Sequence, residues 1–284
     1  MLRNTKLDKR LNEVLKSVWL NGGLSVWTKR IVATLGVCGV LACISVAGEL
    51  KVGATPVPHA QILRFITPAL KAQGVDLKIV DFTDYVMPNL ALEEKNLDAN
   101  FMQHKPFLDK ISKDRNLHLK AIANVHIEPI GAYSKKIKNI KELKNGALVL
   151  IPNDPTNGGR ALILLHNNGL ITLKDSTNLS SNESDIIKNP KKLKIKALEA
   201  AILPKALGDG DLAVINGNYA MQIGLTTKDA LIVEDSRSPY ANILVVREGD
   251  EGKEDIIKLK NALQSAELKA FLLDNYKGEI VPAF

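Results

Sequence analysis

The stretch that decides the fold is Leu50–Gly74, LKVGATPVPHAQILRFITPALKAQG. Residues 50–54 form a short β-like run that ends at a Thr-Pro turn. A helix is then predicted from Pro58 through Gln73, since apolar residues recur there at helical spacing. The apolar positions on one side of this helix are Ile62, Phe65, Ile66 and Leu70. A strand, a turn and an amphipathic helix in this order are the first half of a β-α-β unit.

The alternation of β-like and helical runs continues to the end of the chain. Further strands are predicted at residues 77–80, 98–101, 119–125, 147–151, 212–215 and 242–247. Further helices are predicted at residues 85–95, 106–113, 157–168, 218–223, 254–265 and 267–275. Such alternation is typical of an α/β protein with a mainly parallel sheet covered by helices.

The length of the chain after the expected signal segment suits two lobes. About 235 residues follow position 47, enough for a sizeable core without disulfides. Two crossovers are expected near residues 128–133 and 233–241, with the C-terminal segment returning to the first lobe. The predicted division is an N-terminal extension and signal segment at 1–47, lobe 1 at 48–130 and 240–284, and lobe 2 at 131–239.

An uncharged apolar run, Ile31–Ala47, precedes this domain and follows Lys29 and Arg30. A membrane-spanning helix needs roughly 20 apolar residues, so the run is short for an anchor and suits the core of a signal peptide. We therefore expect an exported protein that acts in the periplasm or cell envelope.

Three interpretations of this segment stay open. Residues 40–43, VLAC, resemble a lipobox with Val where Leu is usual, and cleavage there would leave Cys43 as a lipidated N-terminus. Residues 45–47, SVA, offer an ordinary cleavage site before Gly48. The third interpretation is an uncleaved anchor. The first would make the protein a membrane-anchored lipoprotein.

Charge and cysteine content narrow the function classes. Of the formal charge of +7, residues 1–30 carry +5, so the remainder carries only +2. No basic stripe with interleaved aromatic residues remains, which argues against a nucleic-acid partner. Both cysteines, Cys38 and Cys43, lie in the apolar run, so the exported domain has neither a disulfide nor a thiolate metal site.

No motif of an enzyme is present, since the chain lacks Gly-x-Ser-x-Gly, a P-loop and His-Glu-x-x-His. The five histidines show no metal-ligand spacing, so we expect no catalytic residue, no metal and no cofactor. His104 lies at a strand-to-helix turn, where sites in α/β proteins usually lie. His126 is expected to be structural.

Residues 153–160, NDPTNGGR, resemble an anion-binding turn at a helix start. They lack the lysine and spacing of a P-loop, and Asp154 or Thr156 would serve equally well as a helix cap. Arg160, one turn into the helix, is interpreted either as an anchor for a ligand carboxylate or as a surface ion pair.

Five separated motifs carry a resemblance to a known family. They are residues 81–85 (DFTDY), 98–104 (DANFMQH), 151–157 (IPNDPTN), 213–216 (AVIN) and 238–242 (SPYAN). In these motifs and their order the chain resembles the NlpA family of methionine-binding lipoproteins, which are substrate-binding proteins of bacterial ABC importers. The resemblance runs from about Leu50 to Phe284. It implies a two-lobed periplasmic-binding-protein fold of type II, with a permease and its ATPase as partners.

The resemblance also implies a ligand pocket. Its positions in this sequence are Tyr85, Met102, His104, Phe107, Arg160, Asn216 and Asn242. Arg160 would hold an α-carboxylate bidentately. Asn216 and Asn242 would offer carbonyl oxygens to the ammonium and amide donors to the carboxylate. Tyr85, Met102 and Phe107 would enclose a thioether.

Two positions depart from the family pattern, which usually has an aromatic residue at position 102 and Tyr at position 107. The polar end of the pocket is unchanged, so an amino acid remains the expected ligand. L-methionine is the leading ligand, with another small amino acid or a short peptide as the alternative. An exported enzyme and a surface-interaction protein are the hypotheses from other classes.

Overall fold

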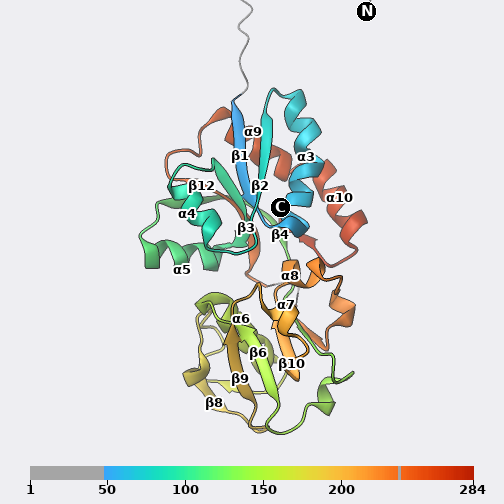
Figure 1. Ribbon diagram of the computed structural model, residues 1–284. Helices are drawn as coiled ribbons and strands as arrows, with labels where there is room; N and C mark the ends of the chain where they lie inside the picture. Colours follow the sequence, from blue (N-terminus) through green and yellow to red (C-terminus); the bar gives the residue numbers. More distant parts are fainter. Residues whose placement is uncertain (1–47, 236–237) are drawn as a thin grey trace, which may run out of the picture. The chain divides into compact units, whose positions relative to one another are not determined.

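The computed structural model describes residues 48–235 and 238–284 (Figure 1). The expected signal segment and Cys43 lie outside the described residues. Of the helices in the described part, none is both long enough and apolar enough to cross a bilayer.

The first lobe is built on a six-stranded sheet with the order β13-β4-β12-β3-β1-β2. Its strands are β1 (Glu49–Ala54), β2 (Asp76–Asp81), β3 (Ala99–His104), β4 (Leu119–Ile127), β12 (Ala241–Arg247) and β13 (Val281–Pro282). Its helices are α3 (Gln61–Ala72), α4 (Met87–Glu93), α5 (Lys105–Arg115), α9 (Glu254–Leu263) and α10 (Ala266–Tyr276).

The second lobe is built on a five-stranded sheet with the order β11-β5-β10-β6-β9. Its strands are β5 (Gly131–Tyr133), β6 (Leu148–Pro152), β9 (Lys194–Leu198), β10 (Leu212–Ile215) and β11 (Ile232–Val233). Its helices are α6 (Pro155–Asn167), α7 (Leu203–Ala206) and α8 (Gly217–Gln222), and β7 (Thr172–Leu173) pairs with β8 (Ile186–Lys188) beside them.

Both sheets are covered on two faces, and the alternation of strand side chains explains why. In β12, Leu244 and Val246 join the core under α3, α9 and α10, whereas Ile243 and Val245 join the core under α4 and α5. In β6, Val149 faces α6, and the opposite face of the sheet packs against α7 and α8. Strands buried on both faces read as continuous apolar runs, which is how the sequence shows them.

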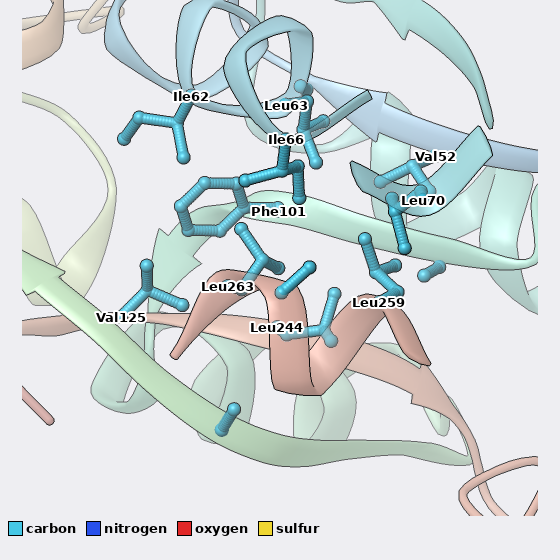
Figure 2. Packing of buried hydrophobic residues seen from close by; sticks show 14 of the residues in the cluster. Val52, Ile62, Leu63, Ile66, Leu70, Phe101, Val125, Leu244, Leu259 and Leu263 are labelled. Atoms are coloured by element: carbon cyan, nitrogen blue, oxygen red, sulfur yellow. The ribbon is translucent and has the colours of Figure 1, made fainter. Parts of the chain in front are cut away.

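The amphipathic helix that opens the fold differs in detail from the prediction. It begins at Gln61, because residues 56–60 form an irregular turn with a cis Val57–Pro58 bond. Leu63 is fully buried in its core-facing side (Figure 2), whereas Phe65 is 39% exposed and stacks on Phe271. The predicted apolar side was therefore wrong at one position, because Phe65 packs against a neighbouring helix at the surface.

The expected mainly parallel sheet is wrong for both lobes, whose sheets are mixed. In the first lobe β2, β1 and β3 are parallel, but β12 runs antiparallel between β3 and β4. In the second lobe β5 is antiparallel to both β10 and β11. β12 enters its sheet directly from the second lobe, without a covering helix before it. Alternating strands and helices do not reveal such an insertion.

Two segments connect the lobes. The first lies between the end of β4 at Ile127 and the start of β5 at Gly131. The second lies between the end of β11 at Val233 and the start of β12 at Ala241. We call them the first crossover and the second crossover.

Leu63→Ala should lower the free energy of unfolding by about 2–5 kcal/mol, because it leaves a cavity in the tightly packed core of the first lobe. Leu273→Ala on α10 is the matched control, since Leu273 is 53% exposed and its truncation should cost less than about 0.5 kcal/mol. Urea denaturation of both variants measures the difference. Equal losses would contradict the packing described for α3.

Candidate ligand-binding site

A cavity lined by residues of both lobes lies between them. All seven positions predicted from the sequence line it: Tyr85, Met102, His104, Phe107, Arg160, Asn216 and Asn242. Six further residues complete its wall, namely His59, Gln103, Glu128, Asn157, Gly217 and Asn218.

The ends of strands deliver most of these side chains. His104 is the last residue of β3, Asn157 follows β6, and Asn216 follows β10. Asn242 is near the start of β12, which is antiparallel to β3 and so begins at the same edge of its sheet. The cavity therefore lies at the carboxyl ends of parallel strands from both lobes, the usual place for a site in open α/β sheets.

His104 connects the two lobes as a neutral ring. Its Nδ1 accepts a hydrogen bond from the backbone N–H of Phe107 (3.2 Å) and thereby caps α5. Nε2–H is then free to donate to Oδ1 of Asn157 in the second lobe (3.1 Å). Burial, and after it the charge of Arg160, lower the pKa of His104 to about 3, so the ring carries no charge at neutral pH.

The apolar end of the cavity is formed by Met102, Phe107 and Tyr85. The register between β3 and β12 shifts at Met102, which is left without a partner in the pairing, as in a β-bulge. The ring of Tyr85 lies edge-on to that of Phe107, with 5.8 Å between centroids. Tyr85 also donates to Oδ1 of Asn218 across the lobes (2.6 Å).

The residues around position 158 form a helix cap and close backbone contacts. Asp154 caps α6 by accepting from the backbone N–H of Asn157 (2.9 Å), as one interpretation of the sequence held. A Cβ at Gly158 would lie 2.9 Å from the carbonyl oxygen of Pro152, and one at Gly159 only 2.5 Å from that of Leu179. Both glycines therefore allow α6 to pack closely against the backbone beside it.

Arg160 forms a buried ion pair rather than a surface one. The side chain is 4% exposed, and Nε donates to Oε1 of Glu234 at 2.9 Å while Nη2 donates to Oε2. Nη2 also donates to the carbonyl oxygen of Glu128 (2.8 Å), and the guanidinium lies 4.2 Å from the centre of the Tyr240 ring. Within residues 48–235 and 238–284, Nη1 makes no hydrogen bond.

Asn216 and Asn242 differ in the hydrogen bonds that their side-chain oxygens accept. Asn216 donates through Nδ2 to Oδ1 of Asn157 (2.7 Å), and its own Oδ1 is buried without a partner among the described residues. Oδ1 of Asn242 is 3.0 Å from Nε2 of His59 and accepts its hydrogen bond. His59 therefore uses one of the two acceptor positions of this oxygen, and the role expected for Asn242 stays a prediction.

Sequence reasoning missed a buried cluster of His59, His126 and Glu128. Nε2 of His126 lies 2.6 Å and Nε2 of His59 lies 3.3 Å from the same oxygen, Oε1 of Glu128. Thr55 bonds Nδ1 of His59 (2.7 Å). The one available signal was a lone glutamate inside the apolar stretch around the predicted first crossover.

The cluster has the residue types of a metal site, and its ligand atoms lie within 4.8 Å of one another. Its spacing is that of hydrogen bonds, however. Two ligand atoms bound to one tetrahedral zinc at about 2.1 Å stand roughly 3.4 Å apart, well beyond the 2.6 Å between His126 and Glu128. We interpret the cluster as a carboxylate that accepts from Nε2 of His126, with the ring of His59 packed beside it.

The electrostatics agree with this interpretation. Burial lowers the pKa of His59 to about 4, so the ring is neutral at neutral pH and acts as a donor. Burial works to raise the pKa of the Glu128 carboxyl, but its neighbours His59, His126 and Arg160 together hold it below its usual value. Glu128 is therefore a buried carboxylate.

Two lobes that enclose a polar and apolar cavity define the class of protein. It is a two-lobed binding protein of the periplasmic type II fold, and the fold class expected from the sequence is confirmed. The chain belongs to the NlpA lipoprotein family, whose sequence model matches residues 50–284. The resemblance drawn from the five motifs is thereby confirmed.

Named relatives cover most of the chain. The D-methionine-binding lipoprotein MetQ of Escherichia coli (strain K12) is 47% identical over 224 residues, which are 78% of this chain and 83% of that one. A nutrient-binding protein from Burkholderia cenocepacia, solved bound to methionine, has a TM-score of 0.80 and 43% identity and covers 83% of this chain and 100% of its own. A periplasmic substrate-binding protein of an ABC transporter from Coxiella burnetii has a TM-score of 0.79 and 40% identity, with 82% and 100% covered.

The rings of His59 and His104 should not titrate between pH 5 and 8, whereas exposed His118, whose pKa the hydrogen bond to Glu93 raises above 6.5, should do so. Proton NMR of the imidazoles, assigned with single His→Gln variants, measures this. Because both buried pKa values lie below 6.5, the unfolded chain takes up protons first, and each ring lowers stability as the pH falls from 6.5 toward 4. A midpoint near 6.5 for either buried ring would contradict the hydrogen bonds described.

Proposed function

We propose that this protein captures methionine between its two lobes and delivers it to the permease of an ABC importer, without catalysing a reaction. The observation that carries the proposal is the gathering of all seven expected positions, from both lobes, around one cavity. The methionine bound to the Burkholderia cenocepacia protein and the ABC transporter named for the Coxiella burnetii protein support it.

In this proposal the carboxylate of the ligand lies at Arg160. Two edges of the guanidinium are used by Glu234 and by the backbone of the first crossover, which leaves the N–H groups of Nη1 for a carboxylate. Nδ2 of Asn242 is a further donor, because only Oδ1 is engaged by His59.

The side chain of the ligand lies at Met102, Phe107 and Tyr85. The aromatic edges can contact a thioether sulfur, which contributes about 0.3–1.5 kcal/mol for each contact. Met102 is flexible and would adapt to more than one apolar side chain. Another apolar amino acid is therefore the alternative ligand that the structure itself favours.

The proposal also covers the lobe boundaries, the cellular location and the protein partners. We propose lobe boundaries at 48–130 with 240–284 and at 131–239, supported by the membership of the two sheets. The protein would act in the periplasm or cell envelope and bind a permease with its ATPase, anchored through a lipid on Cys43. The lipoprotein names of the family and of the Escherichia coli relative support the anchor.

Mass spectrometry of ligand released from the purified full-length protein tests this function, followed by calorimetry on stripped protein. L-methionine is the ligand we propose, and D-methionine is the comparison, because the Escherichia coli relative is named for it. Micromolar or tighter binding of L-methionine supports the proposal. Binding of neither enantiomer, with another molecule released, would reject methionine as the ligand.

Arg160→Ala should weaken methionine binding by about 2–5 kcal/mol, because it removes the buried charged partner of the ligand carboxylate. Arg160→Lys should restore only part of the affinity, since an ammonium cannot form the two-pronged contact. Calorimetry measures both variants.

Arg247→Ala is the matched control for this prediction. Arg247 is also a mostly buried guanidinium, paired with Asp250 and donating to the carbonyl of Leu92, but it lies outside the cavity. Its loss should lower stability and leave methionine affinity unchanged. If the Arg160 variants bind like the wild type, Arg160 does not hold the ligand.

Restoring the usual family residues with Met102→Phe plus Phe107→Tyr should raise selectivity for methionine over leucine. A ring narrows the space open to branched side chains, and a misplaced methylene in an apolar pocket is worth about 1–3 kcal/mol, so roughly a tenfold shift is the most expected. Competition binding measures the ratio, with Met87→Phe on the surface of α4 as control. An unchanged ratio would show that these two positions do not contact the ligand side chain.

A further inference from the structure

Glu128 is a buried carboxylate in the wall of the cavity, and nothing in the family resemblance assigns it a role. It follows β4 in the first crossover and is 5% exposed. Oε1 accepts from His126 at 2.6 Å and lies 3.3 Å from Nε2 of His59, and the backbone oxygen accepts from Arg160. No described residue donates a hydrogen bond to Oε2.

One imidazole, that of His126, donates to this carboxylate. The neutral ring of His59 is bonded to Thr55 through Nδ1 and to Asn242 through Nε2, so it supplies no positive charge. Nδ1 of His126 is buried with no partner in the described chain. Arg160 is engaged by Glu234 and contacts only the backbone of Glu128. A buried carboxylate in this position needs a cation.

The start of α8 places a second acceptor beside it. A Cβ at Gly217 would lie 3.4 Å from Oε2 of Glu128, so the first turn of α8, which lies beside the first lobe (Figure 1), packs directly on this carboxylate. The residue before it, Asn216, is 6% exposed and leaves Oδ1 buried without a partner among the described residues. Glu128 and Asn216 both line the cavity beside the start of α8, and no described side chain donates to Oε2 of the one or to Oδ1 of the other.

We propose that Glu128 binds the ammonium group of the amino-acid ligand, through Oε2 and together with Oδ1 of Asn216. This inference rests on the proposed function and adds a residue to it. The carboxylate of the ligand then lies at Nη1 of Arg160 and the ammonium at Glu128, so the cavity recognises both charges of a zwitterion. Oδ1 of Asn242 already accepts from His59, whereas Oδ1 of Asn216 has no partner among the described residues.

Calorimetry with two ligands tests the proposal on stripped full-length protein. The ligands are methionine and 4-(methylthio)butanoate, which has hydrogen in place of the ammonium. Glu128→Gln keeps the size and the acceptor for His126 but loses the charge. It should weaken methionine binding at least about tenfold, as expected for a lost buried charge partner, and change binding of the analogue less than about threefold.

Glu234→Gln is the control, since it removes another carboxylate, next to Arg160. Both ligands carry the carboxylate that Arg160 holds, so this variant should change both affinities by the same factor and leave their ratio unchanged. Equal weakening of both ligands by Glu128→Gln would mean that Glu128 only supports the fold, and unchanged methionine binding would mean that it does not touch the ligand. Either result overturns the proposal.

If Glu128→Gln does not fold, the wild-type protein still decides the question. The 2-hydroxy analogue of methionine keeps a donor in place of the ammonium but has no charge there. It should bind at least about tenfold more weakly than methionine, because a buried carboxylate distinguishes a cation from a neutral donor. Equal affinity would overturn the role of Glu128. Wild-type protein that binds no methionine would instead reject the proposed function itself.

Discussion

The ion pair between Arg160 and Glu234 is the interaction on which the site depends. A guanidinium that is 4% exposed is stable only when its donors are used, and this one uses Glu234 of the second crossover and the backbone of Glu128 in the first. One side chain of α6 thus fixes both segments that connect the lobes. A ligand bound at Nη1 of Arg160 would extend a hydrogen-bond network that already connects the two crossovers.

Much of the fold and most of the polar site follow from local sequence. Strands buried on both faces appear as continuous apolar runs, and residues directly after such runs lie at the edge of a sheet. His104, Asn157 and Asn216 each occupy such a junction, and the cap at Asp154 fixes where α6 begins. Pattern alone brings these residues to one edge of each sheet, and the family resemblance assigns their roles.

The remaining features depend on contacts that no local pattern encodes. His59 bonds Asn242 across 183 positions of sequence, and β12 enters its sheet from the other lobe. The bulge that leaves Met102 unpaired depends on how two distant strands register, not on the residues of β3 alone. Phe65 fits the apolar side of its helix by period, yet it stacks on a helix from the end of the chain.

The polar half of the cavity shows why neutral histidines suit a site for a charged ligand. A lysine or arginine paired with Oε2 of Glu128 would supply the cation that this carboxylate needs and leave nothing for a ligand to supply. The neutral ring of His59 lies 3.3 Å from Oε1 and adds no positive charge beside it. His104, also neutral, donates to Asn157, which in turn orients Asn216. Neutral donors therefore hold acceptors of the site in place, and the positive charge that pairs with Glu128 comes from the ligand.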